Sequence, residues 1–371
     1  MPRDLLELKR RVDGAIRPED LLGAEYFALA PSALLEAVGA KFEELFEQVD
    51  RAGSDTNEDR TLAREIVAKL RELHSQAMQM IELGLYGFYG YNKDRTDAYR
   101  KSFKVGSNTY FVGPKYFECD EHTLYQGFMQ RDGESVGDVM IKVAASHTIS
   151  SFIQREADIL TQLHQLEVPQ WKHLPLLIDR FEADSRLGLI FRATGGYTLR
   201  EIMRRGRWSG GIDRKHMIWI LDRILSLLGY VHSCGVIHGN INPDTIVIQP
   251  KAHNAILIGW ERAQHEWPLP TPMQMAQDAD PEFAAPEVKE SGVIGAWSDI
   301  YALGRTMIWI LSGGNSKQVP PMVEEPLREL LYSMTEQRRR NRKNDAWLLY
   351  DEQGRIKDQL WERKFLPFVV D

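Results

Sequence analysis

The sequence lacks the features of several large classes of protein. Its 371 residues include only two cysteines, Cys119 and Cys234, whose separation suits neither a disulfide framework nor a metal site, so we expect two ordinary thiols. No apolar run approaches the ~20 residues of a membrane span, and the charged start at Met1–Asp4 is unlike a signal peptide. The net charge of -7 does not favour a nucleic-acid backbone as the main partner. These absences predict a cytoplasmic protein that binds neither membrane nor structural metal.

The first part of the chain, residues 1–90, has the apolar spacing of helices. Apolar residues recur every three or four positions after Pro31, and again from Glu58 to a C-cap at Gly84. A polar turn separates the two stretches, and the leucines before Val12 add a third helix. The pattern predicts a helical hairpin module.

The remainder of the chain changes in composition and in apolar pattern at two points. Residues 91–104 are polar and aromatic and read as a linker. Short β-rich runs and one helical run then share a single lobe, and they lie at 108–112, 124–129, 139–143, 151–166 and 188–193. We therefore predict an α+β fold, with a small β-rich lobe at 105–194 and a helical lobe at 195–371 that ends in a helical tail.

The segment 234–248 resembles the catalytic loop of protein kinases, which runs His-Arg-Asp, then Leu-Lys-Pro, then Asn. Here His238 and Pro243 keep the frame. Upstream, Lys142 ends a Val-Met-Ile-Lys run similar to the Val-Ala-Ile-Lys strand of kinases, and Glu156 stands where their partner glutamate occurs. The resemblance implies a bilobal protein-kinase-like fold.

Two further motifs follow in the order that kinases have them. Ala285-Pro-Glu287 matches the Ala-Pro-Glu motif, and Trp297–Gly304 resembles the helix whose aspartate, here Asp299, braces the catalytic loop. The resemblance covers roughly residues 105–340. It implies that Glu287 and Asp299 are structural.

The residues that kinases use for chemistry are replaced. Asn240 stands at the general-base aspartate and Thr245 at the metal-binding asparagine, while Gly259 stands where the Asp-Phe-Gly aspartate should be. Losing a general base costs roughly 10² to 10⁴ in rate, and losing a metal ligand adds several kcal/mol to the barrier. We therefore expect no catalytic residues here and no bound metal.

ATP and magnesium are not expected as cofactors. The stretch 117–122, where kinases have a glycine-rich loop over the phosphates, contains three acids and no glycine. Met140 replaces the small alanine that packs on adenine. Lys142 and Glu156 are either the remaining pair of a nucleotide site or a structural ion pair that ties a strand to a helix.

Residues at packing positions of the kinase fold are retained, although the residues used for catalysis are replaced. Leu160, His238 and Trp260 match three positions of the hydrophobic column that joins the two lobes of kinases, and Asp299 could anchor its base. The basic run 337–343 is expected to be a solvated face, with contact to nucleic acid or an acidic partner as the alternative.

The chain also resembles a group of bacterial and phage proteins that join a J-domain-like region to a degenerate kinase domain. The shared features are His-Gly-x-x-x-Pro at 238–243, Asp345-Ala-Trp347, and Phe365–Phe368. True J domains carry His-Pro-Asp between their two main helices, whereas the loop 51–57 has no such triplet. The resemblance implies a degenerate J-domain-like module at 1–90.

Three functions remain open. The first is a pseudokinase that works as a scaffold or regulator, binding a protein partner through the N-terminal helices or the helical lobe. The second is an unconventional ATP-dependent serine/threonine kinase, or another phosphotransferase, in which Glu261 or Asp244 holds the metal. The third is a co-chaperone-like adaptor. The segment 344–352 reads as a short amphipathic helix in which Trp347 and Leu348 seal the helical lobe, with an aromatic docking surface as the alternative.

Overall fold

A computed structural model describes residues 3–15, 18, 21–22, 26, 31–52, 57–82, 101–166, 168–265, 280–362 and 366–370. The chain divides into two compact units. The first consists of Met1–Ser150, Leu166–Lys172 and Leu176–Ala193, and the second of Ser151–Gln165, His173–Pro175 and Thr194–Asp371. The helix expected within the β-rich lobe thus groups with the second unit. The predicted domain boundaries themselves remain a prediction.

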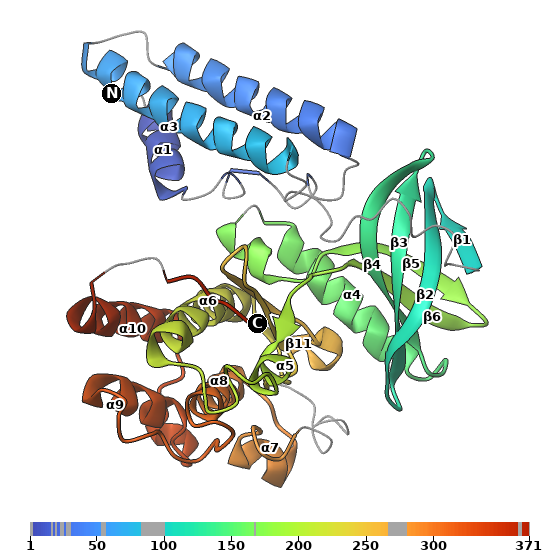
Figure 1. Ribbon diagram of the computed structural model, residues 1–371, viewed down its shortest axis with the longest axis vertical. Helices are drawn as coiled ribbons and strands as arrows, with labels where there is room; N and C mark the ends of the chain where they lie inside the picture. Colours follow the sequence, from blue (N-terminus) through green and yellow to red (C-terminus); the bar gives the residue numbers. More distant parts are fainter. Residues whose placement is uncertain are drawn as a thin grey trace. The chain divides into compact units, whose positions relative to one another are not determined.

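Three amphipathic helices open the first unit (Figure 1). They are α1 Arg3–Gly14, α2 Pro31–Ala52 and α3 Asn57–Glu82. Their apolar stripes form one core, which includes the fully buried Val38, Phe42, Ile66 and Leu70. This confirms the three helices read from the apolar spacing, whereas the predicted turn at Gly53 and C-cap at Gly84 lie outside the described residues.

The first unit also contains an antiparallel sheet of six strands in the order β1-β2-β3-β4-β6-β5. The strands are β1 Lys101–Val105, β2 Asn108–Glu118, β3 His122–Arg131, β4 Glu134–Ala144, β5 Leu177–Ala183 and β6 Arg186–Arg192. Tyr110, Met129 and Ile190 are fully buried in its core. The four predicted strands are present and longer than expected. Strand β1 begins inside the segment assigned to a linker, whose residues 91–100 lie outside the described part of the chain.

The second unit is built from helices with short strands between them. Its helices are α4 Ser150–His164, α5 Leu199–Met203, α6 Arg214–Ser233, α7 Pro286–Ser291, α8 Ala296–Leu311, α9 Glu325–Met334 and α10 Ala346–Leu360. Its strands are β7 Tyr197–Thr198, β8 Val236–Ile237, β9 Ile246–Gln249, β10 Asn254–Leu257 and β11 Gln264–His265. Short 3-10 helices lie at η4 Pro169–His173, η5 Trp260–Arg262 and η7 Arg339–Asn341, and the first of them has residues in both units. No helix in the described ranges has both the length and the apolar content to cross a membrane.

Helix α10 corrects one expectation from the sequence. Asp345 caps it by accepting from the Leu348 N–H, and the helix continues far beyond the predicted end at residue 352. Leu348 is 66% exposed, so the prediction that it seals the helical lobe was wrong. Trp347 does pack on α6, because an added Cβ at Gly229 would lie 2.5 Å from its ring.

Candidate functional site

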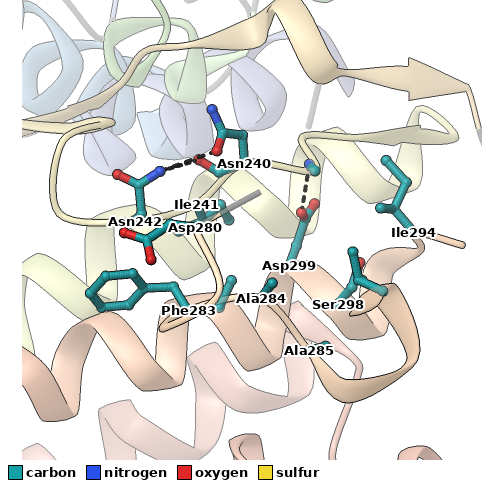
Figure 2. A pocket seen from close by; sticks show the side chains of 13 residues that line it. Asn240, Ile241, Asn242, Asp280, Phe283, Ala284, Ala285, Ile294, Ser298 and Asp299 are labelled. Atoms are coloured by element: carbon teal, nitrogen blue, oxygen red, sulfur yellow. Dashed lines mark hydrogen bonds between the residues drawn. The ribbon is translucent and has the colours of Figure 1, made fainter. Parts of the chain in front are cut away.

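The segment between β8 and β9 contains the residues that resemble a kinase catalytic loop. One carboxylate fixes its backbone. Asp299, in the first turn of α8, accepts from the backbone N–H groups of His238 at 2.9 Å and Gly239 at 2.8 Å. The Asp299–Gly239 bond is drawn in Figure 2. The same carboxylate lies 3.0 Å from Nε2 of His232 and is 1% exposed. Asp299 therefore sets the backbone path at the start of the loop.

His238 is held in one neutral form. Its Nδ1 accepts from the Asn240 N–H at 3.2 Å, so the proton is on Nε2, which donates to the Ile258 carbonyl at 3.1 Å. The ring meets Trp260 edge to face, with centroids 4.7 Å apart. Complete burial lowers the pKa of His238, against the smaller opposing effect of nearby carboxylates. This ring has no free nitrogen for general-base work.

Asn240, predicted to stand at the general-base position, belongs to an amide network. The Asn242 side-chain amide donates to Oδ1 of Asn240 at 3.1 Å and to its backbone oxygen at 3.2 Å (Figure 2). The Asn242 Oδ1 in turn accepts from the Asp244 N–H at 2.8 Å. An amide oxygen cannot hold an abstracted proton as a carboxylate does.

The two positions that bind magnesium in kinases do not fit the ion. The Thr245 hydroxyl donates to the backbone oxygen of Asn240 at 3.0 Å and accepts from the Asn242 N–H at the same distance. Gly259 has φ 81° and no side chain, and a Cβ added there would lie 2.8 Å from the Thr245 methyl. The nearest carboxylate oxygen to that Cβ, Oε1 of Glu261, is 3.6 Å away. These positions offer neither of the expected ligands.

A small cavity lies beside the loop. Its volume is about 20 Å³, and its walls include Asn240, Asn242, Asp280, Phe283 and Asp299 (Figure 2). That volume holds about one water molecule.

An arginine forms ion pairs with two acids at the loop, Asp244 and Asp280. Arg200, in α5, lies 2.7 Å from Asp244 and 3.6 Å from Asp280. Its guanidinium also lies over the Trp309 ring, 5.2 Å from the centroid. Sequence reasoning missed Arg200 and Asp280. Asp280 could have been found from its position five residues before Ala285. Arg200 has no local signature in the sequence.

Lys142 and Glu156 are both buried, at 6% and 2% exposure. Lys142, in β4, pairs in register with Leu124 and Leu189, and its ammonium lies 5.9 Å from the Phe191 ring centroid. Glu156 lies in α4, which belongs to the second unit, whereas β4 belongs to the first. The pairing of the two residues stays a prediction.

The remaining predicted residues lie in well-packed positions of the second unit. Leu160 is fully buried in α4. Glu287, in α7, receives two hydrogen bonds from Arg342, at 2.6 and 3.1 Å. Arg342 has no exposed side-chain surface and also donates to the Trp297 and Glu336 carbonyls. The expectation that 337–343 is a solvated face is thus wrong for Arg342, because two carbonyls and a carboxylate surround it.

A six-stranded antiparallel sheet in the first unit, and a helical second unit whose loop is braced by a buried aspartate, define a protein of the protein-kinase-like class. The chain belongs to the protein kinase domain family, which matches residues 124–346. This family assignment confirms the fold class predicted from the sequence.

Individual relatives agree with this assignment. Serine/threonine-protein kinase D of Synechocystis is 27% identical over 175 residues, which cover 45% of this chain and 32% of the relative. Serine/threonine-protein kinase B of the same organism is 29% identical over 175 residues, covering 45% of this chain and 29% of the relative. The chain thus spans about a third of the length of these relatives. A crystal structure of a kinase domain aligns with a TM-score of 0.54 at 14% identity, covering 71% of this chain and 97% of that domain, and so supports the fold alone.

Proposed function

We propose that this member of the protein kinase family is a pseudokinase that serves as a protein-binding scaffold or regulator. The observation that carries the proposal is the hydrogen bonding of the loop, in which the Asn240 Oδ1 accepts from the Asn242 amide and the Thr245 hydroxyl bonds to backbone groups of Asn240 and Asn242. An amide at position 240 cannot hold an abstracted proton as a carboxylate does. Gly259 contributes no ligand.

The energetic consequence of these replacements is large. Phosphoryl transfer relies on positioning and on charge neutralisation by metal ions. A missing general base removes roughly 10² to 10⁴ in rate, and missing metal ligands remove several kcal/mol of transition-state stabilisation. The combined loss leaves little catalysis.

The partner is proposed to bind at the N-terminal helices or at the helical lobe, in the cytoplasm. Residues 1–90 would be a degenerate J-domain-like module, 91–104 a linker, 105–194 the smaller lobe and 195–371 the larger lobe. Without His-Pro-Asp in the loop 51–57, the module would dock a partner rather than stimulate a chaperone. A pull-down from the native cell, compared with one using a chain that lacks residues 1–90, tests this placement.

A phosphotransfer assay tests the lack of activity. The purified chain is incubated with radiolabelled ATP and magnesium or manganese, beside the variant Lys142→Ala. We expect equal background turnover from both proteins. ATP turnover that Lys142→Ala abolishes would contradict the proposal.

One observation favours a second candidate, an unconventional phosphotransferase. The Glu261 carboxylate approaches to 3.6 Å from the Cβ position at residue 259, where the metal-binding aspartate of kinases would begin. Asp244, by contrast, is paired with Arg200 at 2.7 Å. If Glu261 replaces the missing ligand, ATP with magnesium should raise the melting temperature of the chain. Glu261→Gln should abolish that rise, and the control Asp244→Asn should leave it unchanged.

A further inference from the structure

The turn between β2 and β3 brings together three side chains that bind metals. Strand β2 ends at Glu118 and β3 begins at His122, so Cys119 to Glu121 form the turn. The Cys119 N–H donates to the His122 carbonyl at 3.0 Å, and the Glu121 carbonyl accepts from the Ala145 N–H at 2.9 Å. The backbone that carries these side chains is therefore fixed at both ends of the turn.

The donor atoms of Cys119, Glu121 and His122 all lie within 4.8 Å of one another. Within the described part of the chain, no other three histidine, cysteine, aspartate or glutamate side chains meet this criterion. The Cys119 Sγ lies 3.6 Å from Nδ1 of His122. With Zn–S near 2.3 Å, Zn–N near 2.05 Å and a tetrahedral angle, two ligands of one zinc ion lie about 3.6 Å apart. The sulfur and the ring nitrogen thus already have the spacing of two zinc ligands.

The surroundings suit a partly enclosed ion. His122 is 8% exposed, while Cys119 and Glu121 are half-buried. The Phe117 ring packs against the imidazole, with centroids 5.8 Å apart. One sulfur, one nitrogen and one oxygen donor favour zinc over magnesium or calcium, which prefer oxygen ligands. Three protein ligands leave the fourth tetrahedral position for water.

We propose that Cys119, Glu121 and His122 form a zinc site in the β2–β3 turn. The sequence does not reveal it, because only one of the three ligands is a cysteine and the pattern Cys-x-Glu-His matches no paired motif. A bound cation would offset the negative charge of this acidic turn and join the end of β2 to the start of β3. The turn lies in the stretch 117–122, which stands where kinases have a glycine-rich loop.

The competing interpretation is a hydrogen bond between the thiol and the imidazole, at the same 3.6 Å separation. The two interpretations differ in stoichiometry and in spectrum. Zinc and cobalt bind the thiolate, so binding releases a proton and weakens as the pH falls. A cobalt–thiolate bond also gives a charge-transfer band in the near ultraviolet, which a hydrogen bond cannot give.

Metal titration of the full chain tests the proposal. The chain is stripped with a chelator, and cobalt chloride is then added while absorbance is recorded. We expect a thiolate-to-cobalt band that saturates at one equivalent, disappears on addition of zinc, and is accompanied by a higher melting temperature. Absence of the band in the wild-type chain would overturn the proposal.

Substitutions locate the site. Cys119→Ser should remove the band, and His122→Gln and Glu121→Gln should each weaken zinc binding more than the roughly 10- to 100-fold cost of outer-shell changes. Cys234→Ser is the matched control, because Cys234 is the other free thiol and lies at the end of α6. An unchanged band in Cys119→Ser, or its loss in Cys234→Ser, would contradict the assignment. Circular dichroism of each metal-free variant verifies folding, and Glu121→Gln decides the question if Cys119→Ser does not fold.

Discussion

Asp299 bonds with one carboxylate to two loop N–H groups and to His232, all at 3.0 Å or less. In Asp299→Asn, an NH2 group replaces one carboxylate oxygen. This group would face an N–H donor and could not accept its hydrogen bond. We expect the free energy of unfolding to fall by about 3 kcal/mol, the upper range for a hydrogen bond to a charged group. All of the nine tryptophans except Trp171 belong to the second unit, so urea unfolding followed by fluorescence reports on this loss.

The matched control for this experiment is Asp351→Asn, which makes the same chemical change on an exposed residue of α10. Its unfolding midpoint should stay near that of the wild-type chain. Equal midpoints for the two variants would show that Asp299 does not brace the loop.

The buried ring of His238 predicts a pH dependence of stability. Burial lowers the pKa of His238 below its ordinary value near 6.5. Between these two values the unfolded chain binds a proton that the folded chain does not, so stability is complete above about pH 6.5 and falls as the pH falls. His238→Gln should be less stable than the wild-type chain at pH 7.5. Between pH 6.5 and 5.5, however, its free energy of unfolding should fall less steeply than that of the wild-type chain, by up to about 1.4 kcal/mol per pH unit.

Urea unfolding at several pH values gives this slope. The exposed His147→Gln is the control and should keep the wild-type slope. Some slope should remain in His238→Gln, because burial also lowers the pKa of His164. Identical slopes in wild type and His238→Gln would contradict the prediction.

At this scale the sequence assigns positions by spacing but cannot give contacts. Fixed spacing from the kinase motifs assigns roles to Asn240, Thr245 and Gly259, because a loop keeps the order of its residues, and these assignments stay predictions. It could not predict that Arg200 pairs with Asp280, since those residues are eighty positions apart and only the fold brings them together. The cluster of Cys119, Glu121 and His122 was missed for a different reason, because these residues are neighbours in the chain but match no paired metal-binding motif.

The contact between α6 and α10 predicts an unusual result for a helical glycine. Alanine is normally favoured over glycine inside a helix by roughly 0.5–1 kcal/mol. At Gly229, however, a Cβ would lie 2.5 Å from the Trp347 ring, whose Nε1 donates to the Ser233 hydroxyl. We expect Gly229→Ala to destabilise the chain by about 1–3 kcal/mol, as overpacking does.

Two comparisons verify the cause. Gly354→Ala, in α10, meets no atom within 4 Å and should stabilise the chain by roughly 0.5–1 kcal/mol. In a Trp347→Ala background, Gly229→Ala should also become stabilising. Thermal unfolding of the four variants measures these differences, and a stabilising Gly229→Ala in the wild-type background would rule out the clash.

Elements with strong periodicity were predicted, and edge elements were not. The apolar residues of α2 and α3 recur every three or four positions and share one core, which fixed their existence and their approximate ends. Strands β1 and β5 lie at the two edges of the sheet and have no fully buried residue. Their short, polar sequences carry no alternation strong enough to identify a strand. Helix α10 was predicted too short because its second half depends on contacts with α6, such as Gln353 to Asp222 at 2.6 Å.

At the scale of the whole molecule, the order of motifs predicted the fold class, whereas the activity depends on groups that act together. The residues assigned to nucleotide handling fall in both units, with Lys142 in one and Glu156 and the loop in the other. Groups that act as a unit contribute to rate in a strongly non-additive way. Restoring only one of these groups should therefore not restore ATP turnover.

This reasoning gives a prediction about reconstruction. Asn240→Asp alone supplies a base but no metal ligand, and Gly259→Asp alone places its Cβ 2.8 Å from the Thr245 methyl. We expect neither single variant to turn over ATP. If ATP raises the melting temperature of the chain, the triple variant with Asn240→Asp, Thr245→Asn and Gly259→Asp should gain turnover, because a base contributes its roughly 10² to 10⁴ only when the metal is held.

Radiolabelled ATP turnover, measured with and without Lys142→Ala, distinguishes real transfer from background. The control triple variant carries Asn242→Asp in place of Asn240→Asp, which adds the same charge to the same loop two residues away, and it should stay inactive. Activity in Asn240→Asp alone would mean that another carboxylate already holds the metal. Since Glu261 approaches the vacant ligand position most closely, that outcome would favour the phosphotransferase over the pseudokinase, and Glu261→Gln should then remove the activity.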